Sequence, residues 1–405
     1  MEPARDLLAA AVDLQPDTVA LRRRLHRRPE VGLNLPETQA TVLEAIDGLP
    51  LRVTTGTAVS SVVGVLEGGR PGPTVLLRGD MDALPMPEDT GLDFASEIPG
   101  VMHACGHDTH VAMLVGAARL LSARQTDLPG KVVFMWQPGE EGYAGAKYML
   151  EEGVLEAAGT PVHSAYALHI TTNFGSGVVT TRRGPAMASS DVIRIVVTGR
   201  GGHASQPSAA LDPVPVAAAI VTALQTMVTR EISVFDPAVV TIAKITAGTT
   251  DNVIPETAEM LGTMRTLSEQ NRTAVKEKLR RLAPAIAAAH GASAEVFIDD
   301  AGYPVTVNAD SAADLVHATT VGLIGPDRAI LERDPIMGAE DWSYVLQRVP
   351  GAMSFLGACP PGLDPDTAPP NHSNRVVFDE DAMAVGVATH VAVALAALDG
   401  TPPTP

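Results

Sequence analysis

The sequence has little cysteine, few aromatic residues and a shortage of positive charge. Two of its 405 residues are cysteines, so no disulfide framework can be built and a reducing, cytoplasmic setting is expected. Aromatic residues make up 3 % of the chain, which argues against platforms that stack nucleobases. The 29 basic residues stand against 47 acidic ones, a net charge of −18. Binding to nucleic acid or to an anionic membrane through bulk charge is therefore not expected.

Long hydrophobic runs are also lacking. The longest apolar stretch, residues 382–398, is interrupted by Thr389 and His390. It falls short of the ~20 residues of a membrane span and is expected to be a buried helix. The first residues carry acids inside a short apolar run, without the basic start of a signal peptide. What the chain has instead is length and 45 % hydrophobic residues, enough for a large core and two or three domains.

Strands and helices alternate over the first 184 residues. The first helix is expected at 17–28, before Pro29. β-Branched and apolar runs between turn residues predict strands at 62–66, 74–78, 131–137 and 164–169. The alternation predicts a largely parallel sheet covered on both faces. It resumes after residue 300 with further helices, one of them at 341–348, and the last five residues are expected to be a disordered tail.

A second pattern occupies residues 185–299. Strand and helix signals follow in the order β-α-β-β-α-β, at 191–198, 213–230, 238–247, 256–265, 269–290 and 294–298. This is the split βαβ arrangement of a ferredoxin-like domain. The expected fold is therefore α/β, with a mostly parallel-sheet domain made of residues 1–184 and 300–405 and an inserted ferredoxin-like domain at 185–299.

Two segments near the first strands carry chemistry. Asp80 and Asp82 directly follow a strand, where open α/β sheets bind ligands; turn-capping aspartates are the ordinary alternative. Cys105 and His107 flank a single glycine, and this pair of ligand types suits Zn²⁺ or a similar ion. Asp108 is expected to hold His107 in place. The alternative for this segment is a buried free cysteine beside a helix cap.

Three later segments add carboxylate and imidazole groups. Glu140 and Glu141 are adjacent in a Pro/Gly turn, where one can bind a metal and the other act as a general base. An exposed acidic turn is the common alternative. His169 ends an apolar strand and His372 lies in a Pro/Asn loop, and each alone is more often an ordinary histidine. Together the segments supply enough ligands for two adjacent metal ions.

Seven motifs in a fixed order make the pattern specific. They are RGDMDALP, MHACGHDTHVAMLVGAARLL, QPGEEGYAGAKYML, ALHI, GRGGHASQP, DNVIPETAEMLGTMRT and GAEDWSYV. In this order they closely resemble metallopeptidase family twenty, in the branch of hippurate hydrolase, N-acyl-amino-acid amidohydrolases, N-acetyldiaminopimelate deacetylase and the auxin-conjugate hydrolases. The early RRRLHRRPEVG is also similar to that branch.

The resemblance implies roles for single residues. It implies the metal ligands of a binuclear site at Cys105, His107, Glu141, His169 and His372. Cys105 corresponds to a ligand that can bridge both ions, and Glu140 corresponds to the general base. One of Asp80 and Asp82 corresponds to an aspartate that orients a ligand, and the choice between them stays open.

The resemblance also implies substrate contacts in the inserted domain. His203 corresponds to a histidine that reaches the scissile carbonyl oxygen, in some relatives from the other subunit. Asn252 and Arg265 correspond to residues that contact the substrate, and Arg265 suits a carboxylate. The inserted domain is implied to act as a lid and to pair two chains into a homodimer.

The expected function is a metal-dependent amidohydrolase that cleaves N-acyl amino acids, either hippurate-like or N-acetylated. Two divalent ions per subunit are expected, manganese or zinc first, with cobalt or nickel as further candidates. A dipeptidase or carboxypeptidase on the same scaffold is the main alternative, although no extra acid marks an ammonium pocket. A non-catalytic binding protein or a structural metal protein would also be compatible with single motifs, but the intact general base and the carboxylate-rich ligand set argue against both.

Overall fold

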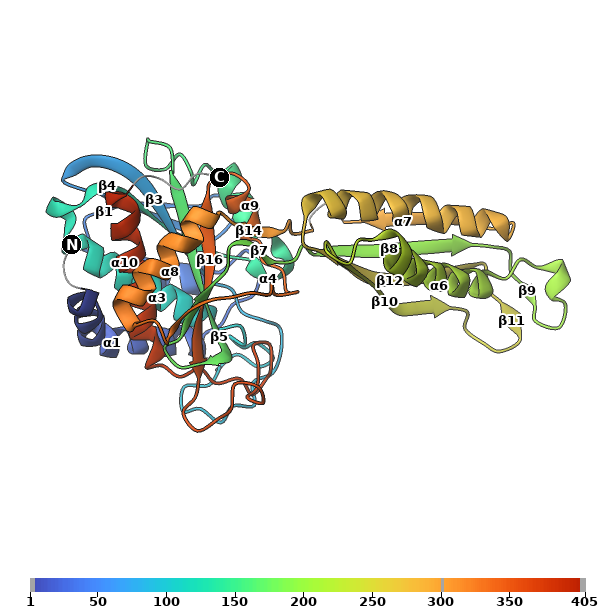
Figure 1. Ribbon diagram of the computed structural model, residues 1–405. Coiled ribbons are helices and arrows are strands. Elements are labelled where there is room, and N and C mark those ends of the chain that lie inside the picture. Colours follow the sequence, from blue (N-terminus) through green and yellow to red (C-terminus); the bar gives the residue numbers. More distant parts are fainter. Residues whose placement is uncertain (1–3, 300–301, 401–405) are drawn as a thin grey trace. The chain divides into compact units, whose positions relative to one another are not determined.

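The computed structural model describes residues 4–299 and 302–400, which divide into two units (Figure 1). Unit 1 comprises Met1–Ala186, Val307–Asp334 and Asp341–Pro405 as far as these are described, and unit 2 comprises Met187–Thr306 and Pro335–Glu340. The predicted boundary at residue 300 and the predicted disordered tail at 401–405 lie outside the described residues. Each unit is described by itself below.

A mixed sheet of eight strands forms the centre of unit 1. The strands are β1 (Leu51–Thr55), β2 (Val62–Glu67), β3 (Arg70–Asp80), β4 (Pro129–Gln137), β5 (Ser164–Gly175), β6 (Val179–Thr181), β15 (Ala329–Leu331) and β16 (Gly351–Cys359). Their order is β1-β2-β4-β3-β5-β16-β6-β15. The four neighbours β4, β3, β5 and β16 run parallel to one another. Strand β2 runs antiparallel to both of its neighbours, β1 and β4. The predicted α/β fold with a mostly parallel sheet is confirmed.

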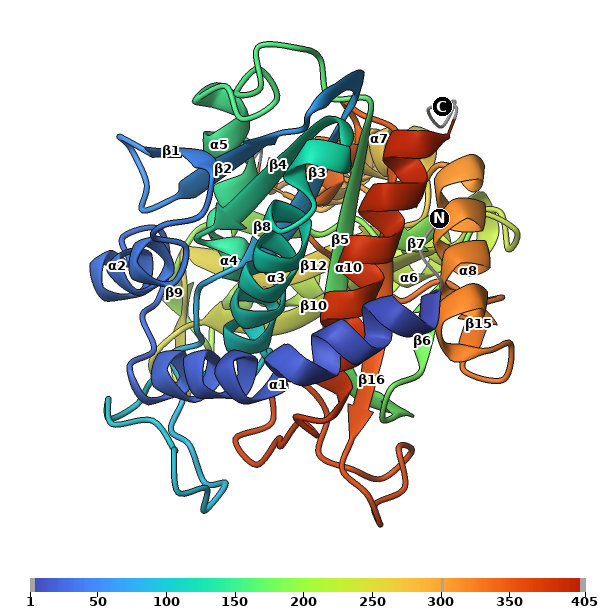
Figure 2. The same ribbon diagram turned by 90° about the vertical axis from the view of Figure 1, so that its left-hand side faces the viewer.

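Helices cover this sheet because its central strands are apolar on both faces. Val75, Leu76 and Leu77 of β3 are all fully buried, although successive side chains point to opposite faces. The helices of unit 1 are α1 (Ala4–Arg27), α2 (Pro36–Ala45), α3 (His107–Ser122), α4 (Glu140–Tyr143), α5 (Gly145–Glu151), α8 (Asp310–Ile324), α9 (Ser343–Leu346) and α10 (Ala382–Asp399). Figure 2 shows α3 and α10 in front of the sheet, with α1 crossing them.

Helix α10 is the apolar stretch singled out in the sequence. By length and composition it could cross a membrane, with a mean hydropathy of 1.7. In the structure 83 % of that window is buried, and residues such as Val387 and Val391 belong to the core of unit 1. The prediction of a buried helix is therefore confirmed.

Unit 2 contains a four-stranded antiparallel sheet. Its elements are β8 (Asp191–Thr198), β9 (Gly202–His203), α6 (Pro213–Glu231), β10 (Ala238–Ala247), β11 (Val253–Ile254), β12 (Thr257–Thr266), α7 (Glu269–Ala289) and β13 (Ser293–Ile298). The strand order β10-β12-β8-β13 is that of the predicted split βαβ arrangement. Ile193, Ile195 and Val197 of β8 alternate with more exposed residues and pack with apolar side chains of α6 and α7.

Two short strands lie where the chain crosses between the units, β7 (Gly184–Met187) and β14 (Thr306–Asn308), and they pair with each other. Some predicted boundaries are wrong. Helix α1 begins at Ala4 rather than at residue 17, and Pro16 lies inside it. The helix expected at 341–348 is reduced to α9, with turns on both sides.

Candidate metal centre

The carboxyl ends of three parallel strands of unit 1 bring the acidic and imidazole groups together. Asp80 is the last residue of β3, the Glu140–Glu141 pair follows β4, and His169 lies within β5. This edge is where open α/β sheets bind ligands, because loops from neighbouring strands converge there. The loops carrying Cys105 and His372 reach the same edge.

The Cys-Gly-His turn depends on its glycine. Gly106 has φ +88°, and a Cβ atom there would lie 2.4 Å from Cγ2 of Ile170. Only glycine combines this left-handed backbone conformation with the absence of a Cβ atom that would clash with Ile170. The turn ends where α3 begins, with His107 as its first residue, so Cys105 and His107 present their side chains to the same place.

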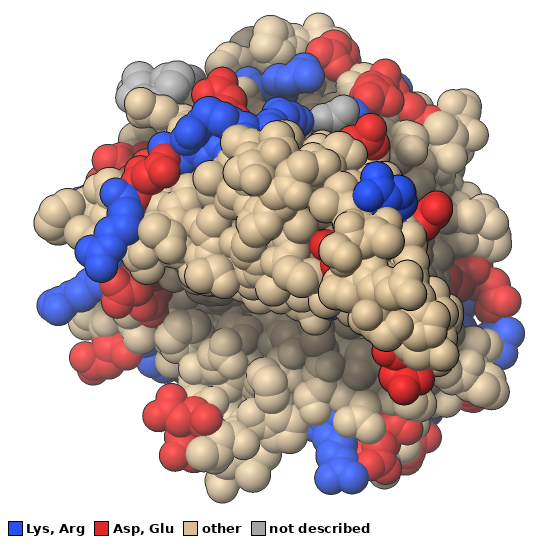
Figure 3. Space-filling view, turned by 90° about the vertical axis from the view of Figure 1, so that its right-hand side faces the viewer, with Lys and Arg blue, Asp and Glu red and all other residues tan. Residues whose placement is uncertain are grey.

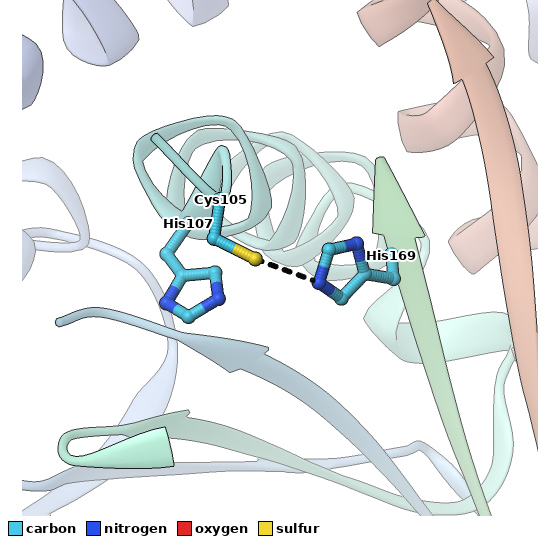
Figure 4. Close-up of side chains that lie close together, drawn as sticks. All are labelled: Cys105, His107 and His169. Carbon is cyan, nitrogen blue, oxygen red and sulfur yellow. Dashed lines mark hydrogen bonds between the residues drawn. The ribbon is translucent and has the colours of Figure 1, made fainter. Parts of the chain in front are cut away.

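Cys105, His107 and His169 form a first group. Cys105 Sγ lies 3.3 Å from His169 Nε2, and one ligand atom from each of the three residues lies within 4.8 Å of the others. Figure 4 shows the three side chains pointing toward one another from the start of α3 and from β5.

Cys105, Glu141 and His372 form a second group with the same sulfur. His372 Nε2 lies 3.3 Å from Cys105 Sγ and 3.2 Å from Glu141 Oε1. Their ligand atoms also lie within 4.8 Å of one another. The structure thus brings all five predicted ligands together, in two groups of three that share Cys105.

Backbone carbonyls orient two of the imidazoles. His107 Nδ1 donates to the carbonyl oxygen of Asp82 at 2.8 Å, and His169 Nδ1 donates to that of Ile170 at 2.7 Å. In the neutral ring this leaves each Nε2 without a proton, ready to bind a metal. Among the described residues, His107 Nε2 is buried without a hydrogen bond.

The local charge favours a cation. Burial alone would lower the pKa of His107, but Asp80 and Cys105 outweigh it and raise that pKa well above the ordinary value. Hydrogen bonds with Cys105 and Glu141 raise the pKa of His372 to about 10. In both cases a carboxylate, Asp80 beside His107 and Glu141 beside His372, stabilises positive charge at this place. Nitrogen, sulfur and carboxylate donors are a set that zinc and similar ions accept, so the residues fit a metal centre.

Burial acts differently on the other two ligands. It lowers the pKa of His169 well below its ordinary value, and the neighbouring His110 lowers it further, so this ring is neutral at pH 7. Burial raises the pKa of the Cys105 thiol, and Glu141 adds to the shift. A metal ion must therefore displace a proton from Cys105 when it binds.

The two aspartates that the sequence could not separate have different partners. The Asp82 carboxylate accepts hydrogen bonds from the backbone N–H groups of Glu140 and Glu141, at 2.9 and 3.0 Å. It therefore fixes the glutamate turn, while its carbonyl orients His107. Asp80 is fully buried, lies 2.8 Å from an Arg78 nitrogen and 3.3 Å from His107 Nε2.

The turn after β4 holds Glu140 beside the two groups. Gly139 begins the turn with φ +71°, where a Cβ would lie 2.4 Å from a methyl group of Leu33. Ala144 ends it with φ +55°, an unfavourable conformation for alanine. Oxygens of Glu140 and Glu141 and a nitrogen of His107 lie within 4.8 Å of one another. The Glu140 side chain is thus held next to the ligand atoms.

The prediction for Asp108 is wrong. Its carboxylate accepts hydrogen bonds from Arg22 Nε at 2.7 Å and from His26 Nδ1 at 2.8 Å. The motif RRRLHRRPEVG supplies both donors, so its basic residues anchor the start of α3 to α1. The carbonyl of Asp82 orients His107 instead.

Two further residues at the site were not assigned roles from the sequence. His110 donates from Nδ1 to Asp80 and accepts from the Ile170 N–H at Nε2, so both of its nitrogens are engaged. Asn371 donates to two backbone carbonyls. His110 lies in the motif that carries Cys105 and His107, and Asn371 directly precedes His372 in the Pro/Asn loop. The sequence shows where both residues lie but not which groups they bind.

The predicted substrate residues lie in unit 2. His203 and Val253 are paired in β9 and β11, and Asn252 directly precedes Val253 in the chain. Ser205 N–H donates to His203 Nδ1 at 3.1 Å, leaving Nε2 as the donor of the neutral ring. Arg265 is half-buried on β12, and no hydrogen bond or ion pair with a described residue holds its guanidinium.

Comparisons with known proteins agree with this geometry. The profile of Peptidase family M20/M25/M40 matches residues 76–396. The chain is 39 % identical over 381 residues to thermostable carboxypeptidase 1 of Saccharolobus solfataricus, covering 93 % of this chain and 94 % of the relative. It is 36 % identical to IAA-amino acid hydrolase ILR1-like 4 of Arabidopsis thaliana, covering 93 % and 84 %.

Two bacterial proteins complete the comparison. N-acetylcysteine deacetylase of Bacillus subtilis is 35 % identical, with 91 % of this chain and 93 % of the relative covered. A solved structure from Bacillus subtilis, described as a dinuclear metal binding peptidase from the M20 family, superposes with a TM-score of 0.82 at 31 % identity, covering 96 % and 99 %. The IAA-amino acid hydrolase and the N-acetylcysteine deacetylase match the branch that the sequence motifs resemble. The chain therefore belongs to peptidase family M20/M25/M40, a family of amide-bond hydrolases.

Proposed function

We propose that this protein is a metal-dependent amidohydrolase that removes the acyl group from N-acyl amino acids, hippurate-like or N-acetylated. One observation carries the proposal. Five donor side chains form two groups around the shared Cys105 sulfur, and the Glu140 carboxyl lies beside them. Relatives named as an N-acetylcysteine deacetylase and an IAA-amino acid hydrolase support the acyl-amino-acid class of substrate.

In this proposal each group of three holds one divalent ion. Cys105, His107 and His169 bind the first ion, and Cys105, Glu141 and His372 bind the second. Manganese or zinc is expected first, and cobalt or nickel can fill the same donor sets. When bound, such ions acidify a water molecule and polarise the substrate carbonyl.

Glu140 moves the proton. Its carboxylate takes a proton from the attacking water and later delivers that proton to the amide nitrogen, so that the amine leaves neutral. Asp82 supports this step because it holds the backbone of the glutamate turn through two hydrogen bonds. Asp80 supports the ligand set through its position 3.3 Å from His107.

Unit 2 supplies the substrate contacts in this proposal. The Nε2–H donor of His203 suits the scissile carbonyl oxygen, where losing one donor commonly lowers the rate ~10²- to 10³-fold. The half-buried guanidinium of Arg265 suits the substrate carboxylate, and Asn252 is proposed as a further contact. These three roles remain predictions.

Pairing of two chains through unit 2 also remains a prediction, as does a cytoplasmic location. Uncharged residues occupy the middle of the face shown in Figure 3. Val239 and Ile245 of the edge strand β10 are 42 % and 51 % exposed, which supports a protein contact along that strand. The two cysteines, Cys105 and Cys359, are unbonded, which is consistent with a reducing compartment.

A carboxypeptidase is the second candidate function. The observation that favours it is the 39 % identity to thermostable carboxypeptidase 1. Both activities use a substrate with a free carboxylate, so Arg265 suits either one. They differ in the group on the other side of the scissile amide, which is an acyl group in one case and a peptide in the other.

A substrate panel separates the two functions. The protein is reconstituted separately with Mn²⁺, Zn²⁺, Co²⁺ and Ni²⁺ and assayed on hippurate, N-acetyl amino acids, plain dipeptides and blocked peptides. The proposal expects the highest kcat/KM on an N-acyl amino acid. A preference for peptides would favour the carboxypeptidase, and no hydrolysis with any metal would exclude both.

A further inference from the structure

The residue before His372 makes an unusual pair of hydrogen bonds. The side-chain amide of Asn371 donates to the carbonyl oxygen of Cys105 at 3.0 Å and to that of Ile170 at 3.0 Å. An amide group has two N–H donors, and both are used here. The two acceptors lie 65 residues apart in the chain, in different segments of the site.

Each acceptor belongs to a segment that carries a proposed ligand. One acceptor is the backbone carbonyl oxygen of Cys105, and the other is that of Ile170, the residue after His169. The Ile170 carbonyl also accepts from His169 Nδ1 at 2.7 Å, so its two lone pairs are both engaged. One amide group thus ties the loop of His372 to the segments of the other ligands.

His372 needs such support more than the other imidazoles. Its φ is +69°, in the left-handed region that non-glycine residues rarely adopt. Its side chain is 54 % exposed, whereas that of His107 is fully buried. No carbonyl orients its ring through Nδ1 among the described residues, in contrast to His107 and His169.

The rest of the loop has independent anchors. The His372 N–H donates to the Ala104 carbonyl at 2.9 Å, and the Thr172 hydroxyl donates to the Pro369 carbonyl at 2.9 Å. These bonds do not involve the Asn371 side chain. Removing the amide is therefore expected to leave the loop folded but to loosen the direction in which His372 points.

We propose that Asn371 is a positioning residue that holds His372 on the second metal ion. Loss of the Asn371 amide should therefore lower the affinity for the second ion selectively. The inference rests on the proposed function, since it assumes that the two groups bind metal. Loss of a hydrogen-bonding partner of a metal ligand commonly lowers metal affinity 10- to 100-fold, and we expect about that change for the second ion. The first ion keeps His107 and His169, each with its own carbonyl, and its affinity should change less than about threefold.

The test is a Co²⁺ titration of chelated protein. Thiolate-to-cobalt absorption follows the binding at Cys105, and calorimetry counts the ions and gives their affinities. The variants are Asn371→Ala and Asn371→Leu, which keeps the size of the side chain without an N–H donor. Asn374→Ala, in the same loop, is the matched control because, within the described part of the chain, Asn374 makes a hydrogen bond through its backbone carbonyl and none through its side chain.

The expected result has three parts. Wild-type protein and Asn374→Ala bind two ions, both Asn371 variants bind the second ion 10- to 100-fold more weakly, and melting temperatures of the chelated proteins agree. Two unchanged affinities, or an equal loss at both ions, in whichever Asn371 variant folds would overturn the role of Asn371 while leaving the proposed metal centre intact. A wild-type protein that binds no cobalt would instead refute the proposed function.

Discussion

Asp80 in unit 1 and Asp191 in unit 2 are both completely buried, and their surroundings differ. Asp191 in unit 2 is held by Arg272, with nitrogen-to-oxygen distances of 2.8 Å to both carboxylate oxygens, and by Lys276 at 2.7 Å. Asp80 in unit 1 lies beside His107, whose Nε2 is buried without a hydrogen bond. Both carboxylates are fully buried, but Asp80 lies beside a proposed metal-binding ring nitrogen without a hydrogen bond, whereas Asp191 is held by two basic side chains.

This difference separates a structural ion cluster from a site for chemistry. The Asp191 carboxylate is paired within the protein with Arg272 and Lys276, so we expect this cluster to act on stability. At the edge of the parallel sheet, nitrogen, sulfur and carboxylate oxygen atoms converge, and His107 Nε2 is buried there without a hydrogen bond among the described residues, an arrangement that a bound metal ion would complete. The predictions below test this contrast, in order of their expected effect on turnover.

The largest effect is expected for Glu140→Gln. The substitution keeps the size of the side chain and removes the proton-carrying carboxylate, so kcat should fall by about 10²- to 10⁴-fold. Metal content and melting temperature should stay at the wild-type values, because Glu140 is not among the proposed ligands. Normal hydrolysis by this variant would remove Glu140 from the mechanism.

A smaller loss of turnover under saturating metal is expected for Cys105→Ala. The sulfur belongs to both groups, so its removal should lower the affinity for both ions by at least about 10-fold. Elemental analysis of the purified variant measures this loss, with the melting temperature of the chelated protein as the folding control. Full metal occupancy would show that Cys105 is not a ligand.

The smallest effect on turnover is expected for Asp191→Ala. It leaves Lys276 without its carboxylate partner and leaves Arg272 paired with Glu269 alone, and the two side chains are only 19 % and 10 % exposed. Breaking such a pair should destabilise the protein by about 3–5 kcal/mol, measured by chemical denaturation. Metal content should be unchanged, and kcat should be close to wild type below the melting temperature. A loss of metal in this variant would contradict the distinction between a structural ion cluster around Asp191 and a metal centre beside Asp80.

The sequence predicted the elements of the fold well where local signals are strong. Strand 191–198 and strand 238–247 have the predicted bounds. Burial alternates along the whole of the first strand but only over the first residues of the second. The start of α1 was missed because Pro16 lies within the helix. The three-residue strands β6 and β15 carry no periodic signal, and they form only by pairing with each other and with β16.

The sequence allowed the proposed metal ligands to be predicted, but not the hydrogen bonds that hold them in place. Cys105, Glu141 and His372 could be named as ligands because the segments occur together and their motifs resemble a known family, although His372 alone would be taken as an ordinary histidine. The roles of Asp82 and Asn371 depend on backbone groups of distant segments, which no local pattern records. For the same reason Asp108 was assigned to its sequence neighbour, although it binds Arg22 and His26.

The central claim is that one sulfur serves two metal ions, and anomalous diffraction from zinc-loaded crystals tests it most directly. We expect two anomalous peaks per chain, each about 2.3 Å from Cys105 Sγ, one beside His107 and His169 and the other beside Glu141 and His372. A single peak, or two peaks of which one lies away from Cys105, would contradict the account.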